Sequence, residues 1–227
     1  MAQCVGYNRC NHKDCDKEYC ARRARLEILY KMSMLSDSQL KPITLCVDSD
    51  NTDLEEFKYL SQVAKNIKEF VSEGRNLLIY SKTCGNGKTS WSIKIAQSFI
   101  ESVWAEDISK CRVLFISVPR FLLALKENIT QKSEYVEKIK QRLSVADLVI
   151  WDDIGAKAGS EYEINHLLSY IDGRIALGKS NIFTSNLGED ALYAALGDRL
   201  ASRICHMSQV IEFRGSDKRI YTQYSKS

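Results

Sequence analysis

The chain has 227 residues, of which 44% are hydrophobic and 27% are charged, which is typical of one or two globular domains and too apolar for a disordered chain. Its 32 basic and 29 acidic side chains leave a formal net charge of only +3, which by itself does not indicate a nucleic-acid-binding protein. No apolar run approaches the roughly 18 residues that a membrane-spanning helix needs, and the first residues lack the apolar core of a signal peptide. We therefore expect a cytoplasmic protein.

The first twenty residues contain four of the eight cysteines. Cys4, Cys10, Cys15 and Cys20 follow the pattern C-x5-C-x4-C-x4-C, and His12 lies just after the second of them. Clustered cysteines in an intracellular chain favour a metal site over disulfides. Four thiolates can close a tetrahedral Zn²⁺ site, and zinc binding would supply folding energy to this polar segment. The spacing matches no common zinc finger, so His12 in place of one cysteine, or an iron–sulfur cluster, stays open.

Two helical regions separated by a polar stretch are expected before residue 75. ARRARLEILYKMSML (21–35) has apolar residues at helical spacing, and LEEFKYLSQVAKNIKEFVSEG (54–74) is predicted to be one amphipathic helix that ends at its glycine. Residues 36–53 are polar and are predicted to form a linker and loop. We therefore divide the chain into a cysteine-rich, zinc-binding segment (1–35), the linker, and a globular domain (54–227).

Short apolar runs alternate with helical patterns in the rest of the chain. The runs are NLLIY (76–80), RVLFISV (112–118), DLVIWDD (147–153), SNIFTSN (180–186) and QVIEFRG (209–215). Helices are expected over residues 89–103, 119–129, 134–143 and 162–177. Continuous apolar strands separated by helices are typical of a parallel sheet covered on both faces. The predicted fold is α/β, with five parallel strands flanked by helices and ligands bound at the carboxyl ends of the strands.

A phosphate-binding loop is expected directly after the first strand, in SKTCGNGKTS (81–90). Its latter part fits the pattern G-x4-G-K-[ST], in which glycines let successive backbone N–H groups point at one anion, next to the positive end of a helix. The residues expected to bind ATP are Cys84, Gly85, Asn86, Gly87, Lys88, Thr89 and Ser90. Lys88 would contact the β- and γ-phosphates, and Thr89 would bind Mg²⁺ through its hydroxyl oxygen. Lys82 stands where the pattern has its first glycine.

Two carboxylates end the third strand, LVIWDD (148–153). Asp152 is placed to hold the Mg²⁺ shell, and Asp153 to orient or deprotonate the attacking water. Most hydrolases of this kind have glutamate at the second position, so the shorter Asp153 predicts either a closer water or slower turnover. The fourth strand ends at Asn186, whose place in this order predicts a sensor that lies beside the γ-phosphate.

Five segments of the chain resemble the AAA+ ATPases, and among them the replicative helicase loaders of the DnaC/DnaI type, especially phage-encoded ones. These segments are SKTCGNGKTSW, LVIWDDIGAK, NIFTSN, LGDRLASRI and FRGSDKR. The resemblance covers residues 54–221. It implies an ATPase that binds a replicative hexameric helicase and delivers it to single-stranded DNA in DNA replication. A cysteine-rich zinc-binding amino terminus is also known in DnaI-like loaders, where this domain grips the helicase.

The resemblance also implies roles for particular residues. Arg199 or Arg203 in LGDRLASRI would be an arginine finger that reaches the ATP of a neighbouring subunit, and such a finger requires self-association. Arg219 in FRGSDKR would act as a second sensor. A lysine-rich segment would follow the backbone of single-stranded DNA. Its candidate contact residues are Lys126, Lys132, Lys138, Lys140 and Arg142.

Three other functions stay open at the level of sequence. An IstB-like transposition helper shares the same ATPase core, although the cysteine-rich amino terminus favours a loader. A P-loop kinase that phosphorylates a small molecule would carry an arginine-rich lid segment, and we find none in the sequence. A nucleotide-gated adaptor with little hydrolysis is consistent with Asp153 in place of glutamate.

Overall fold

The computed structural model describes residues 20–40, 43, 45–48, 50–157 and 159–218. Five parallel strands form one sheet in the order β2-β3-β4-β1-β5. The strands are β1 (Asn76–Tyr80), β2 (Val113–Ser117), β3 (Leu148–Asp152), β4 (Ser180–Ser185) and β5 (Gln209–Glu212). The predicted α/β class and the five-stranded parallel sheet are therefore confirmed.

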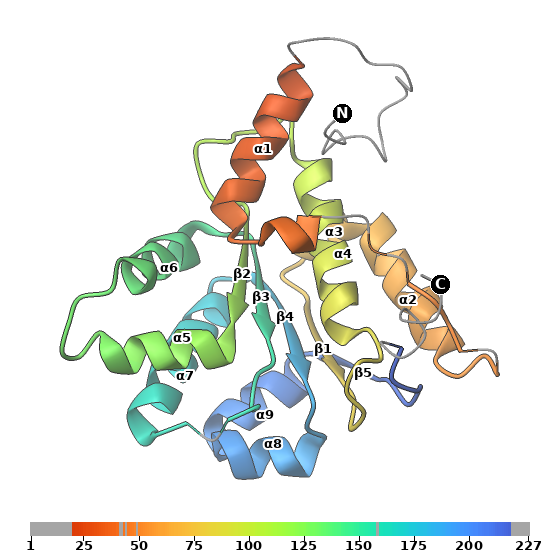
Figure 1. Ribbon diagram of the computed structural model, residues 1–227, viewed down its shortest axis with the longest axis vertical. Coiled ribbons are helices and arrows are strands. Elements are labelled where there is room, and N and C mark those ends of the chain that lie inside the picture. Colours follow the sequence, from red (N-terminus) through yellow and green to blue (C-terminus); the bar gives the residue numbers. More distant parts are fainter. Residues whose placement is uncertain (1–19, 41–42, 44, 49, 158, 219–227) are drawn as a thin grey trace, which may run out of the picture.

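Helices cover both faces of this sheet (Figure 1). They are α1 (Ala21–Ser33), the 3-10 helix η2 (Asp37–Leu40), α2 (Leu54–Lys65), α3 (Ile67–Ser72), α4 (Lys88–Ser102), α5 (Val118–Glu127), α6 (Glu134–Val145), α7 (Glu161–Ala176), α8 (Glu189–Leu196) and α9 (Asp198–His206). Because side chains alternate along a strand, Leu77 and Ile79 of β1 pack under α1–α4, whereas Leu78 packs under α5–α9. Among the described residues, no helix is both long and apolar enough to cross a bilayer.

Helix α1 is built into the core of the sheet domain. Leu26 and Leu29 are buried in the same apolar cluster as the residues of α4 and β2. The Arg25 guanidinium also donates hydrogen bonds to the carbonyl oxygens of Trp104 (2.8 Å) and Glu106 (2.5 Å), just beyond the end of α4. The sequence grouped this helix with the cysteine-rich segment, and the division of the chain at residue 35 stays a prediction.

Two predicted elements end earlier than expected. The single helix expected over 54–74 is wrong, because the chain breaks between α2 and α3 at Asn66, where φ is −105° and ψ is 30°. This change of direction allows the apolar faces of both pieces to be buried against the core. The strand expected over 209–215 ends at Glu212. The Phe213 N–H still donates to the Tyr80 carbonyl oxygen of β1, but the N–H groups of Arg214 and Gly215 turn to a carboxylate of the linker.

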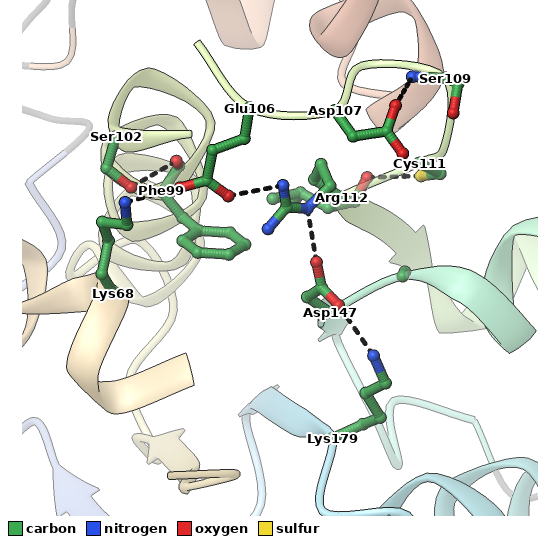
Figure 2. A network of polar contacts seen from close by, with 12 residues as sticks. Lys68, Phe99, Ser102, Glu106, Asp107, Ser109, Cys111, Arg112, Asp147 and Lys179 are labelled. Atoms are coloured by element: carbon green, nitrogen blue, oxygen red, sulfur yellow. Dashed lines mark hydrogen bonds and ion pairs between the residues drawn. The ribbon is translucent and has the colours of Figure 1, made fainter. Parts of the chain in front are cut away.

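A chain of ion pairs lies at the amino ends of the strands (Figure 2). Glu106 accepts from Lys68 of α3 (2.6 Å) and from Arg112 (2.9 Å), which in turn donates to Asp147 (2.5 Å), and Asp147 also pairs with Lys179 (2.8 Å). Burial opposes ionisation of Asp147, but the hydrogen bonds from Lys179 and Arg112 outweigh it and lower the pKa of its carboxyl group. The network ties α3 to the starts of β2, β3 and β4, at the end of the sheet opposite to the predicted phosphate loop.

Arg174 is a buried arginine that lies against the start of β4. The Arg174 side chain, on α7, donates to the carbonyl oxygens of Leu143 (3.0 Å), Ala146 (2.9 Å) and Ser180 (2.8 Å) and to Oδ1 of Asn181 (2.8 Å). Burial lowers the pKa of its guanidinium to about 10. These bonds join the end of α6 to the start of β4, so Arg174 works as a structural crosslink.

Candidate nucleotide-binding site

The phosphate loop lies at the carboxyl end of β1 and leads directly into α4, which begins at Lys88 (Figure 1). The loop curls through Gly85 and Gly87, whose φ angles are +76° and +104°. Only glycine adopts such angles without strain. Lys82, the departure from the pattern, is exposed where the chain leaves the strand, and the turn forms through the two later glycines.

Side chains inside the loop hold its curled shape. The Asn86 amide and the Thr83 backbone N–H both donate to the Ser81 hydroxyl oxygen, at 2.5 and 3.0 Å. The Lys88 ammonium group folds back over the loop and donates to the Thr83 carbonyl oxygen (3.0 Å) and to Asn86 Oδ1 (3.2 Å). Lys88 is only 6% exposed, so its charge is held inside the concave face of the loop, where an anion would bind.

The predicted magnesium ligands lie together beside the loop. The Thr89 hydroxyl, in the first turn of α4, donates to Oδ1 of Asp152 at 2.9 Å, and the Thr184 hydroxyl of β4 donates to the same oxygen at 2.7 Å. Burial is the main cause that raises the pKa of Asp152, and the nearby charge of Asp153 raises it further. Mg²⁺ is usually held by one or two carboxylates together with substrate phosphates and water, and these oxygens fit that donor set. In the described part of the chain, no group of three or more His, Cys, Asp or Glu side chains forms a closed metal cage.

Asp153 and Asn186 come together at the adjacent strand ends. Asp153 has a φ of +57°, an angle that costs a non-glycine residue about 1–3 kcal/mol, and its backbone N–H donates to the Thr184 hydroxyl oxygen at 2.9 Å. The Asn186 amide lies 3.5 Å from Oδ1 of Asp153. The strained turn therefore aims the second carboxylate toward the residue expected to sense the γ-phosphate.

Thr184 is the site residue that the sequence analysis missed. It lies inside NIFTSN, one of the quoted segments, but only the terminal asparagine was assigned a role. Its hydroxyl is fully buried and bridges Asp152 and the backbone of Asp153. A hydroxyl residue that directly follows the apolar pair Ile182 and Phe183 in a buried strand was the available signal, because a buried hydroxyl needs hydrogen-bond partners.

The two candidate finger arginines lie on α9, and both are exposed. Arg203 pairs with Asp172 of α7 through a 2.7 Å contact between its Nε and Oδ1 of the carboxylate. Arg199, Arg203 and Asp172 line a hollow of about 450 Å³ with four further residues, which are Leu168, Tyr193, Asp198 and Ser202. The arginines are thus presented at the surface of the molecule, and their role stays a prediction.

The lysine-rich segment spreads over α5, α6 and the loop between them. Lys126 and Lys132 are exposed. On α6, Lys138 pairs with Glu134 (2.5 Å) and Lys140 with Glu137 (3.2 Å), so acids of the same helix partly offset the positive charge. Arg142 is half-buried near the end of this helix. DNA contacts by this surface stay a prediction.

Five of the predicted site residues lie outside the described part of the chain, namely Cys4, Cys10, His12, Cys15 and Arg219. Cys20 is half-buried and directly precedes α1. The zinc site and the second sensor therefore stay predictions.

A phosphate loop, a buried aspartate next to its threonine, and an adjacent Asp–Asn pair at the carboxyl edge of a five-stranded parallel sheet define a P-loop nucleotide-binding protein. A family model for IstB-like ATP binding proteins matches residues 6–226. The chain belongs to this family.

Solved structures of replication proteins have a similar fold. The DnaC helicase loader is 17% identical over 76% of this chain and 94% of its own, with a TM-score of 0.60. DnaI is 20% identical over 81% of this chain and 93% of its own, with a TM-score of 0.57. The replication initiator DnaA bound to AMPPCP and single-stranded DNA is 20% identical over 77% of this chain and 51% of its own, with a TM-score of 0.55. No protein with a curated description matches the sequence significantly.

The resemblance to ATPases of the DnaC/DnaI type is thus confirmed at the level of family and fold.

Proposed function

We propose that this protein is an ATP-dependent helicase loader, which binds a replicative hexameric helicase and delivers it to single-stranded DNA. The observation that carries the proposal is the pairing of Thr89 with Asp152 and of Asp153 with Asn186 on a fold similar to that of DnaC and DnaI. The first pair provides oxygens for Mg²⁺, and the second provides a base and an amide at the adjacent strand end. Together they support an ATPase.

The chain's own residues divide the work of hydrolysis. Lys88 would turn from the Thr83 carbonyl oxygen to the β- and γ-phosphates, while Thr89 and Asp152 would hold Mg²⁺, which neutralises phosphate charge when it is bound. Asp153 would orient the attacking water, with Asn186 beside it as the sensor. Because aspartate is one methylene shorter than glutamate, we expect slow hydrolysis that depends on assembly.

Assembly of several copies would complete the site. An arginine finger acts from a neighbouring subunit, and Arg199 and Arg203 are exposed on α9 as such a role requires. Single-stranded DNA would then lie along the exposed basic residues of α5 and α6. The cysteine-rich segment, with bound Zn²⁺, would grip the helicase.

Arg203→Ala and Arg199→Ala test the trans site. We expect at least one of them to lower the ATPase rate of the assembled protein by about 10³-fold, the lower end of the range for an arginine finger, and to leave ATP binding by the monomer unchanged. The measurement is steady-state ATPase activity with helicase and DNA present, together with nucleotide titration of the monomer. Arg75→Ala, an exposed arginine just before β1 that pairs with Glu73, is the matched control. Normal turnover of both α9 variants in the assembled state would exclude both as fingers.

Affinity capture from the host tests the whole function. Full-length protein with ATP present should recover the replicative helicase hexamer, identified by mass spectrometry. A truncation that lacks residues 1–19 should lose the helicase but keep ATP binding. The cut is placed before α1 because Leu26 and Leu29 belong to the core. Recovery of the helicase by the truncated protein would refute the role of the cysteine-rich segment, and capture without any helicase would refute the loader.

An IstB-like transposition helper is the second candidate, because the matching family model carries that description. The same capture distinguishes the two functions, since a helper would recover a transposase and no helicase.

A further inference from the structure

Three segments that are distant in sequence meet at the rim of the phosphate loop. After β5, the Phe213 backbone N–H donates to the Tyr80 carbonyl oxygen at 2.8 Å. The chain then runs to the phosphate loop through residues 214–218, which belong to no helix or strand and which we call the strap. The third segment is the linker before α2, whose aspartates contact the strap.

Two linker carboxylates hold the backbone of the strap. Asp53, which is 7% exposed, accepts from the N–H groups of Arg214 and Gly215, both at 2.8 Å. Asp48 accepts from the N–H of Ser216 at 2.9 Å. A Cβ atom at Gly215 would lie 2.5 Å from Oδ2 of Asp48 and 2.7 Å from Oδ2 of Asp53, so only glycine lets both carboxylates approach. The path of the strap is therefore determined by these two residues.

The end of the strap rests on the phosphate loop itself. The Lys218 backbone N–H donates to the Gly85 carbonyl oxygen at 3.1 Å, and its ammonium group lies over the Phe57 ring, 4.6 Å from the centroid. The Asp217 carboxylate packs directly on Gly85, since a Cβ atom there would overlap its Oδ1. An acidic side chain thus lies against a loop whose geometry is suited to anions.

A carboxylate in this place opposes the binding of a polyphosphate. Both carry negative charge, and like charges a few ångströms apart in a partly desolvated site repel each other. The loop glycine that Asp217 covers is one of the two whose positive φ lets the loop curl around an anion. Nucleotide binding therefore either requires the Asp217 carboxylate to move away or is weakened by its repulsion of the phosphates.

We propose that Asp217 competes with the triphosphate for the phosphate loop, and that Asp48 and Asp53 are positioning residues that hold the strap in the competing place. The proposal rests on the proposed nucleotide binding. ATP would displace Asp217 and weaken the hydrogen bonds between the strap and its two aspartates. The linker would then be bonded to the strap when the loop is empty and released from it when ATP is bound.

Asp217→Asn is the test, because it removes the charge and keeps the size of the side chain. We expect ATP to bind about tenfold more tightly to this variant than to the wild-type chain, as measured by titration with a fluorescent ATP analogue. The increase in affinity should be largest for ATP, smaller for ADP and smallest for AMP, because it depends on phosphate charge. It should also decrease with increasing salt, which screens that charge. Asp190→Asn, an exposed acid in the first turn of α8, is the matched control and should leave the affinity unchanged.

Equal affinity of the Asp217→Asn variant and the wild-type chain would overturn the competition. Weaker binding by the variant would also overturn it, since Asp217 would then contact the nucleotide favourably. Hydrogen exchange gives an independent readout, in which the amides of Arg214, Gly215 and Ser216 should exchange faster when ATP is added. Slower exchange with ATP would contradict release of the strap. If neither chain binds ATP, the proposed function itself fails and the competition with it, an outcome distinct from equal, measurable affinities.

Discussion

Lys88→Ala is expected to weaken ATP binding by at least about a hundredfold. The ammonium group is buried against the phosphate loop, and charge-assisted hydrogen bonds to phosphates contribute about 1.5–3 kcal/mol each, where about 1.4 kcal/mol corresponds to a factor of ten. Alanine leaves the backbone N–H groups of the loop in place but removes the only side-chain cation that the sequence pattern directs at the β- and γ-phosphates. The measurement is the dissociation constant for ATP from titration calorimetry.

Lys94→Ala serves as the control for this prediction. Lys94 belongs to the same helix, α4, and its ammonium group lies over the Trp91 ring, 5.7 Å from the centroid. The Lys94→Ala substitution therefore removes the same charge at a position outside the loop. The thermal unfolding of both variants should be followed as well, because Lys88 also bonds to Thr83 and Asn86 in the empty loop. An unchanged dissociation constant for a folded Lys88→Ala protein would refute the assignment of the phosphate loop.

Arg174→Leu is expected to lower the free energy of unfolding by about 3 kcal/mol or more. Leucine would leave the carbonyl oxygens of Leu143, Ala146 and Ser180 buried without this donor, and each unsatisfied buried group costs about 1–3 kcal/mol. For a chain of this length, 1 kcal/mol corresponds to about 2–4 °C in the melting temperature. A fall of about 6–12 °C or more should therefore appear by circular dichroism or calorimetry.

Two further variants make this result specific. Arg174→Lys keeps a positive charge, but a single ammonium group cannot match the several directions of a guanidinium, so its melting temperature should lie between those of the wild type and the leucine variant. Arg23→Leu replaces an exposed arginine and should stay within about 0.5 kcal/mol of the wild type. If Arg174→Leu melts within about 1 °C of the wild-type protein, the buried bonds do not stabilise the fold.

Most of the sheet could be predicted from local patterns. The strands predicted at 112–118, 147–153 and 180–186 agree with β2, β3 and β4 to within one residue at each end. Strands covered on both faces are continuous apolar runs, and such runs are visible without any knowledge of their partners. The helix predicted over 54–74 failed at Asn66 because the direction of α3 is set by what it packs against, and the local pattern does not contain that information.

The sequence by itself determined the class of site. The left-handed angles of Gly85 and Gly87 are a local requirement, and Lys88 and Thr89 follow them along the chain. Asp152 ends an apolar strand, and parallel strands bring their carboxyl ends to one edge. These relations depend on neighbours along the chain and on one general rule of topology, so the amino-acid sequence contains them.

Only the tertiary structure decided which distant residues complete the site. Thr184 reaches Asp152 across neighbouring strands, Asp53 holds the backbone of Gly215, and Asp217 rests on Gly85. Each of these contacts joins residues 32 or more positions apart. Aspartates in a polar linker and a threonine in a strand are common, and they acquire a role through the partner that folding brings to them. The physical reason is that hydrogen bonds and charge repulsion act over a few ångströms of space, whatever the separation along the chain.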